Sequence, residues 1–231
     1  MGAGIAQTLE SIRGRIHAAA SRAGRDPAMI TLVGISKTVP PERIREAIDA
    51  GLGDLGENRI QEAQEKIPLL PGPVRWHLVG HLQGNKAKFA AELFEVIHSV
   101  DSPGLLQRLD RLAGAAGRTL QALVQIDLAD EPTKFGVEPG RLDAVLEAAA
   151  GCGAVQIRGL MILPPYEEDP ERSRPWFRRL RDLRDDAATR HPQLTLDHLS
   201  MGMSGDFEVA IEEGATIVRV GRALFGARPK R

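Results

Sequence analysis

The sequence has one cysteine, few aromatic residues, and no apolar run of membrane-spanning length. A lone Cys152 excludes an internal disulfide and is typical of a protein in a reducing compartment. No apolar segment of the kind found in secretion signals follows Met1. We therefore predict a cytoplasmic protein without a membrane partner.

The chain also lacks a large excess of positive or negative charge, because its formal net charge is -1. This balance gives no electrostatic reason to expect a nucleic-acid partner. The arginine-rich stretch over 172–190 is interleaved with acidic residues, so it is typical of a solvated helix face. Aromatic residues make up 4% of the chain, which leaves little material for stacking on bases.

Apolar runs alternate with amphipathic segments along all 231 residues. An amphipathic helix over 5–23 comes first, and eight strand–helix units follow it. The predicted strands cover residues 31–37, 54–58, 76–80, 94–100, 120–127, 155–163, 194–200 and 216–220. Strict alternation indicates parallel strands joined by right-handed crossovers. We predict an α/β fold, a single (β/α)8 TIM barrel with an extra N-terminal helix. An open doubly wound sheet is the alternative. No linker or composition shift divides the chain, so we expect one domain over 1–231.

The segment 51–56, Gly-Leu-Gly-Asp-Leu-Gly, matches the dinucleotide-binding pattern G-x-G-x-x-G. That pattern has meaning only where a strand leads into a helix. Here it ends a predicted helix and enters a predicted strand. We interpret it as a helix stop followed by a tight turn.

The first predicted strand leads directly into Lys37. A lysine at the carboxyl end of a buried parallel strand can extend its amine into a cavity at the mouth of the barrel. Burial there lowers the pKa of an amine and makes it nucleophilic toward a carbonyl. The alternative is a lysine whose stem packs at the sheet edge while its ammonium group stays in water.

Glycine and serine follow the last two predicted strands. Barrels often bind phosphate with the loops after strands 7 and 8 and with the start of a short extra helix. Hydroxyl groups and backbone N–H groups in such loops donate to an anion. The candidate phosphate residues are Ser200, Met203, Ser204, Gly221 and Arg222. The alternative is a pair of ordinary loops in which Ser204 or Asp206 is an N-cap.

A phosphate site and a strand-end lysine indicate a phosphorylated carbonyl compound held as an imine. Pyridoxal 5′-phosphate (PLP) and a sugar phosphate bound by a lysine-dependent aldolase both fit. Arg219 shares the strand parity of Gly221, so its guanidinium can point inward and donate to a pyridine nitrogen. The alternative is a charge that neutralises a buried carboxylate or caps the barrel.

Several longer segments resemble the PLP homeostasis proteins, also called PLP-binding proteins, nearly from end to end. The matching stretches are 33–37, 56–62, 76–86, Lys134 with Gly136, 159–161, 199–206 and 219–226. The resemblance implies a barrel similar to the N-terminal domain of alanine racemase. It also implies that Lys37 carries PLP as an internal aldimine, that the loops after strands 7 and 8 hold the phosphate, and that Asn58 lies beside the cofactor. Gly84 departs from the family, where serine is frequent.

The sequence lacks the residues that demanding PLP chemistry requires. The chain ends five residues after Gly226, so we expect no second domain to supply acid–base groups. An arginine at the pyridine nitrogen would leave that nitrogen unprotonated and weaken the ring as an electron sink. We expect a monomeric PLP carrier that serves PLP-dependent apoenzymes. A small PLP-dependent amino-acid racemase or decarboxylase is the alternative. The histidines show no metal-ligand spacing, and we predict a structural role for His81.

Overall fold

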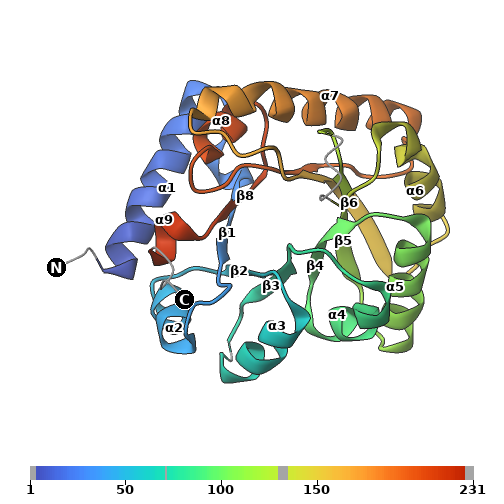
Figure 1. Cartoon of the computed structure of the whole chain (residues 1–231), viewed down its shortest axis with the longest axis horizontal. Helices are drawn as coiled ribbons and strands as arrows, with labels where there is room; N and C mark the ends of the chain where they lie inside the picture. Colours follow the sequence, from blue (N-terminus) through green and yellow to red (C-terminus); the bar gives the residue numbers. More distant parts are fainter. Residues whose placement is uncertain (1–3, 71, 130–134, 227–231) are drawn as a thin grey trace.

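The structure is a computed structural model that describes residues 4–70, 72–129 and 135–226. Eight strands follow one another around a closed barrel, and every neighbouring pair is parallel, including the pair that joins the last strand to the first. Helices surround this barrel on its outside (Figure 1). The predicted (β/α)8 barrel is confirmed, and the open sheet is excluded.

The strands are β1 (Thr31–Ile35), β2 (Asp54–Glu57), β3 (Arg75–Leu78), β4 (Val96–Val100), β5 (Leu120–Ile126), β6 (Val155–Ile162), β7 (His198–Ser200) and β8 (Ile217–Val220). The helices are α1 (Ile5–Arg22), α2 (Pro41–Asp49), α3 (Ile60–Lys66), α4 (Ala87–Leu93), α5 (Pro103–Ala115), α6 (Leu142–Ala149), α7 (Arg174–Arg190), α8 (Phe207–Glu212) and α9 (Arg222–Phe225). Within the described residues, no helix is both long enough and apolar enough to cross a bilayer.

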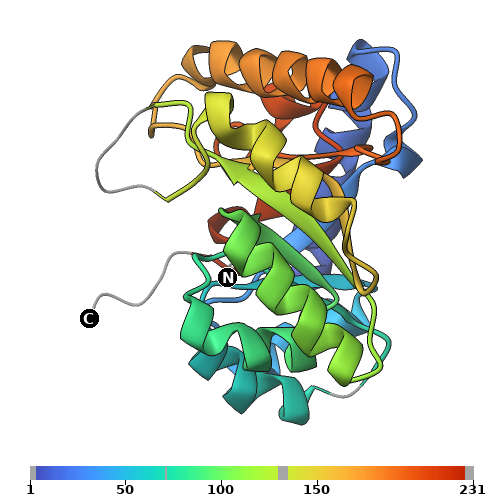
Figure 2. The same ribbon diagram turned by 90° about the vertical axis from the view of Figure 1, so that its right-hand side faces the viewer.

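Helix α1 is the predicted extra helix that precedes the barrel. Its apolar residues at helical spacing, Ile5, Leu9, Ile12 and Ile16, are all buried. They pack this helix beside α2, α8 and α9 (Figures 1 and 2). Because α8 and α9 flank β8, α1 braces the end of the chain that carries the predicted phosphate loop.

The glycine-rich segment 51–56 lies where α2 gives way to β2. Gly51 has a φ of 88°, the left-handed conformation expected just after a helix. The segment therefore does not open a helix, and its interpretation as a helix stop is confirmed.

Strand β7 begins at His198 and not at Leu194, so the predicted strand was too long at its start. The backbone carbonyls of Leu196 and Asp197 accept hydrogen bonds from the Arg184 guanidinium of α7, at 3.2 and 3.4 Å. Those carbonyls are held by a helix side chain, and strand pairing with β6 starts only at His198. The sequence pattern does not reveal this competition, because Leu196 is buried like a strand residue.

The arginine-rich helix α7 is more than a solvated face. Arg174, Arg178 and Arg181 all donate to the carboxylate of Glu213, which follows α8. The Glu213 side chain is only 6% exposed, so these partners balance its burial. The cluster ties α7 to the end of α8 and thereby supports the segment between β7 and β8.

Candidate functional site

The strand ends that carry the predicted lysine and the predicted phosphate loop meet at one mouth of the barrel. Lys37 is partly buried and follows Ser36, which is fully buried at the end of β1. Gly221 follows β8, and a Cβ added to it would lie 3.3 Å from the carbonyl oxygen of Ile35. Ile35, which lies two residues before Lys37, is therefore close to the loop after β8.

The loop after β7 is bound to the start of α9. The Ala223 N–H donates to Ser204 Oγ at 3.1 Å, and the Met203 N–H donates to Asp206 Oδ1 at 2.6 Å. These bonds bring Met203 and Ser204 beside the turn formed by Gly221 and Arg222. Asp206 occupies the N-cap position of α8, as the alternative allowed, but its side chain makes no capping bond to that helix. The structure thus assembles four predicted phosphate residues, and their role toward a phosphate stays a prediction.

Arg219 points into the barrel, as its strand parity predicts. Its side chain is buried, and its guanidinium donates to Ser200 Oγ at 2.6 Å and to the carbonyl of Ile162 at 2.8 Å. Burial lowers the pKa of Arg219 to about 10. Within the described ranges Arg219 forms no ion pair with a carboxylate, so the alternative of a charge neutralised by a buried acid is not what the structure shows.

Ser200 lies apart from the other predicted phosphate residues. Its hydroxyl is fully buried in the barrel, between the Arg219 guanidinium and His98 Nδ1, which is 2.9 Å away. A contact between this hydroxyl and a phosphate would compete with those two bonds. The assignment of Ser200 to the phosphate stays a prediction, and the structure groups Ser200 with Arg219.

Asn58, assigned to the cofactor by resemblance, is the residue after β2 and is partly buried. A Cβ on Gly80 would lie 2.1 Å from the Asn58 carbonyl oxygen, so only glycine at position 80 lets the two strand ends approach this closely. This contact fixes the backbone of Asn58 at the mouth of the barrel.

The sequence interpretation missed a buried ion-pair cluster directly behind Lys37. Lys66 Nζ donates to Glu57 Oε1 at 2.9 Å, to Glu62 Oε1 at 2.6 Å and to the Ser36 carbonyl at 2.6 Å. Glu57 is fully buried and its Oε2 has no hydrogen-bond partner in the described part of the structure. Burial raises the pKa of Glu57, while the Lys66 charge opposes that shift. The spacing of four between Glu62 and Lys66 on one helix was the available signal.

This cluster also holds the backbone on both sides of Lys37. Thr38 has a φ of 62°, which is an outlier for a β-branched residue. Its N–H donates to Glu62 Oε1 at 2.5 Å, and the Ser36 carbonyl accepts from Lys66. Burial alone would raise the pKa of Glu62, but the bonds from Lys66 and Thr38 lower it overall. Helix α3 therefore clamps the turn that carries Lys37.

A double-mutant cycle tests this clamp. Glu62→Ala is expected to cost about 1.5–3 kcal/mol of stability, because a charged acceptor is lost. In a Thr38→Gly background the cost is expected to be smaller, because glycine adopts positive φ without support. Urea unfolding of the four proteins gives the coupling. Glu65→Ala is the control, since Glu65 is exposed on the same helix. Equal costs in both backgrounds would contradict the clamp.

The remaining sequence predictions concern His81, metal binding and Lys134. The His81 ring stacks on Phe135 with centroids 3.5 Å apart, and its Nδ1 lies 3.3 Å from an oxygen of Asp101. His81 Nδ1 makes no hydrogen bond in the described part of the structure, so a structural role for His81 rests on the ring stacking and stays a prediction. No cluster suited to a metal ion occurs among the residues that the structure describes. Lys134 lies outside the described residues.

Comparison with known proteins identifies the family. The family model for the alanine racemase N-terminal domain matches residues 9–229. A pyridoxal phosphate homeostasis protein of Aquifex aeolicus is 45% identical over 223 residues, covering 96% of this chain and 97% of the relative. The chain belongs to the pyridoxal phosphate homeostasis protein family. A family member from Escherichia coli K12 is 40% identical and covers 97% of both chains.

Solved structures agree with this membership. PipY of Synechococcus elongatus PCC7942, solved without PLP, superposes with a TM-score of 0.87 at 42% identity and covers 96% of this chain and all of PipY. PipY with PLP bound gives a TM-score of 0.86 at 41% identity, with the same coverage. Alanine racemase of Clostridium difficile 630 gives 0.70 at 15% identity, covering 98% of this chain and 57% of the racemase. That last likeness concerns the fold alone.

Proposed function

We propose that this protein binds PLP as a Schiff base of Lys37 and takes part in intracellular PLP homeostasis by buffering or delivering the cofactor. The observation that carries the proposal is the common mouth of the barrel, where Gly221 touches the strand that ends before Lys37 and where Arg219 is buried beneath. Membership of the family and the PLP-bound structure of PipY support it.

The residues at this mouth fit the three polar parts of PLP. Lys37 supplies the amine for the aldehyde, and Ser204 with the backbone N–H groups of Gly221 and Arg222 supplies donors for the phosphate. A donation from Met203 would compete with the bond of its N–H to Asp206. Arg219 can donate to the pyridine nitrogen from the barrel side. Asn58 lies at the mouth beside them. When bound, PLP supplies a reactive aldehyde and an electron-withdrawing ring.

A carrier role fits this donor set better than demanding catalysis. A guanidinium is always a donor and does not give up its proton at neutral pH, so the pyridine nitrogen opposite Arg219 would accept and stay unprotonated. Such a ring withdraws electrons weakly. The alternative, a small PLP-dependent amino-acid racemase or decarboxylase, is tested by incubating the protein with a panel of amino acids and analysing the chirality and identity of the products.

The domain organisation, oligomeric state, cellular location and protein partners stay predictions. We propose that residues 1–231 act as one PLP-binding domain, as a monomer in the cytoplasm, and that PLP-dependent apoenzymes are its transient protein partners. Neither the near-neutral charge nor the barrel mouth supports a nucleic-acid partner. A size-exclusion experiment with light scattering measures the oligomeric state directly.

Borohydride reduction tests the proposed function. The purified protein incubated with PLP is expected to be yellow, because a lysine Schiff base absorbs visible light. Borohydride is expected to bleach the colour, and peptide mapping is expected to place the reduced pyridoxyl group on Lys37. Lys37→Ala should stay colourless while it folds normally. A colourless wild-type protein, or a label mainly on another lysine, would falsify the proposal.

A further inference from the structure

The interior of this barrel contains a continuous chain of polar side chains. Asp54 Oδ1 is 2.9 Å from His77 Nε2, and His77 Nδ1 is 2.9 Å from His98 Nε2. His98 Nδ1 is 2.9 Å from Ser200 Oγ, which accepts from Arg219 Nη1 at 2.6 Å. Barrel interiors are usually filled by branched apolar side chains, so a polar chain through five strands is unusual.

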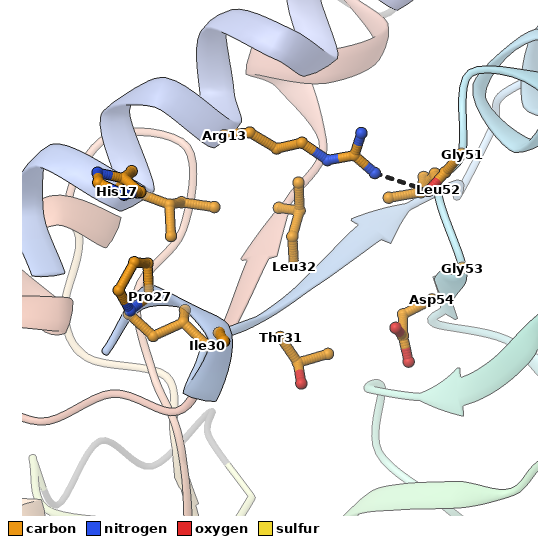
Figure 3. Close-up of a pocket in the computed structure, with 12 residues that line it drawn as sticks. Arg13, His17, Pro27, Ile30, Thr31, Leu32, Gly51, Leu52, Gly53 and Asp54 are labelled. Atoms are coloured by element: carbon orange, nitrogen blue, oxygen red, sulfur yellow. Dashed lines mark hydrogen bonds between the residues drawn. The ribbon is translucent and has the colours of Figure 1, made fainter. Parts of the chain in front are cut away.

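The chain begins beside a pocket at the amino-terminal ends of the strands. Asp54 is the first residue of β2 and lines a pocket of about 540 Å³ at the amino-terminal ends of the strands. Figure 3 shows Arg13 and His17 reaching over one side of this pocket from α1, with Thr31 and Asp54 on the other side. The other end of the chain is Arg219, the next-to-last residue of β8, and the predicted phosphate residues Gly221 and Arg222 follow that strand. The chain thus leads from a pocket open to water to the arginine that lies beneath the predicted cofactor site.

With neutral imidazoles, which burial favours, an ionised Asp54 at one end fixes the direction of every hydrogen bond. A guanidinium only donates and an ionised carboxylate only accepts. Arg219 therefore donates to Ser200, whose hydroxyl donates to His98 Nδ1. His98 then donates from Nε2 to His77 Nδ1, and His77 donates from Nε2 to Asp54. In this order each neutral imidazole carries its proton on Nε2.

The surroundings agree with neutral imidazoles and an ionised Asp54. Burial lowers the pKa of His77 and lowers that of His98 well below its usual value, where the nearby charge of Arg219 adds to the effect. Burial alone would raise the pKa of Asp54, but the bonds from His77 and Arg75 lower it overall. Aligned hydrogen bonds in a low-dielectric interior polarise one another, so the negative end at Asp54 supports the positive end at Arg219.

We propose that Asp54, His77, His98 and Ser200 are positioning residues that hold the Arg219 guanidinium in one orientation at the barrel mouth. This inference rests on the proposed function, in which Arg219 faces the pyridine nitrogen of PLP. It adds that the carboxylate of Asp54, at the start of β2, helps to set the affinity for the cofactor and the spectrum of the bound cofactor.

Asp54→Asn tests the chain at the end where a substitution disturbs the core least. The change removes the negative charge and lets the side-chain amide donate toward His77, which breaks the order of the bonds. The dissociation constant for PLP is expected to rise about fivefold, the equivalent of one hydrogen bond, and the visible band is expected to shift. Asp197→Asn is the matched control, because Asp197 also pairs with an arginine, Arg158, but lies outside the chain and its side chain is 55% exposed. We expect Asp197→Asn to bind PLP like the wild type.

A second measurement needs no cofactor. Nitrogen-15 NMR of the PLP-free wild-type protein is expected to show His77 and His98 neutral with protonated Nε2 at neutral pH, and the His77 signals should change in Asp54→Asn. A charged imidazole or an Nδ1–H form at either position overturns the inference. So does an Asp54→Asn protein with the affinity and spectrum of the wild type. A wild-type protein that fails to bind PLP refutes the proposed function instead, and the NMR result then still judges the hydrogen-bond chain.

Discussion

Lys66→Met is expected to lower the free energy of unfolding by about 3–5 kcal/mol, the usual cost of removing one partner from a buried ion pair. Lys66 Nζ has three partners, Glu57, Glu62 and the carbonyl of Ser36. Glu57 is fully buried, and among the described residues one of its oxygens already lacks a hydrogen-bond partner. Without Lys66, an ionised Glu57 would be left uncompensated in the interior.

The loss caused by Lys66→Met is expected to depend on pH. A carboxyl group whose pKa is higher in the folded protein opposes folding above the folded pKa, and this opposition disappears as the pH falls below the unfolded value. Burial already raises the pKa of Glu57, and loss of the Lys66 charge would raise it further. The stability difference from wild type should therefore shrink between pH 7 and the ordinary glutamate pKa of about 4.3.

Urea unfolding at several pH values measures both effects. Glu57→Gln combined with Lys66→Met is the control, because a neutral amide in place of Glu57 needs no counter-charge. The double variant should recover much of the stability that Lys66→Met loses at neutral pH. A loss that stays constant with pH, or a double variant no more stable than Lys66→Met, would show that Glu57 is not the group left uncompensated.

Gly159→Ala is expected to destabilise the barrel by about 3 kcal/mol or more, through backbone strain together with overpacking. A Cβ at this position would lie 1.8 Å from the backbone carbonyl oxygen of His198, which cannot move like a flexible side chain. Gly159 also has a φ of 154°, a conformation that favours glycine. The residue pairs with His198 where β6 meets the short strand β7.

The same substitution is expected to weaken PLP binding, because β6 carries the Ile162 carbonyl that accepts from Arg219. Gly153→Ala is the matched control. It lies just before β6, has open space around its added Cβ and needs no positive φ. Thermal unfolding and PLP titration should separate the two variants clearly. If Gly159→Ala melted at the temperature of Gly153→Ala, the close approach of β6 to His198 would be wrong.

The alternation of apolar runs with amphipathic segments was sufficient to predict the closed barrel, since eight parallel strands leave few other topologies. Parity along β8 was sufficient to point Arg219 inward. The start of β7 was missed because the Arg184 side chain holds two carbonyls that the strand would otherwise pair. Arg184 lies 12 and 13 positions before these two carbonyls, so hydrophobic periodicity does not reveal the competition.

Taken alone, the sequence determined the fold class, the candidate lysine and the two loops after the last strands, because each of these depends on local pattern and chain order. Only the tertiary structure decided which polar groups share the interior. Glu57 meets Lys66, and Asp54 reaches Ser200 through two histidines, because barrel closure brings strands distant in sequence within hydrogen-bond range. Burial makes those pairings important for stability, because a polar group in the interior must find its hydrogen-bond partner there.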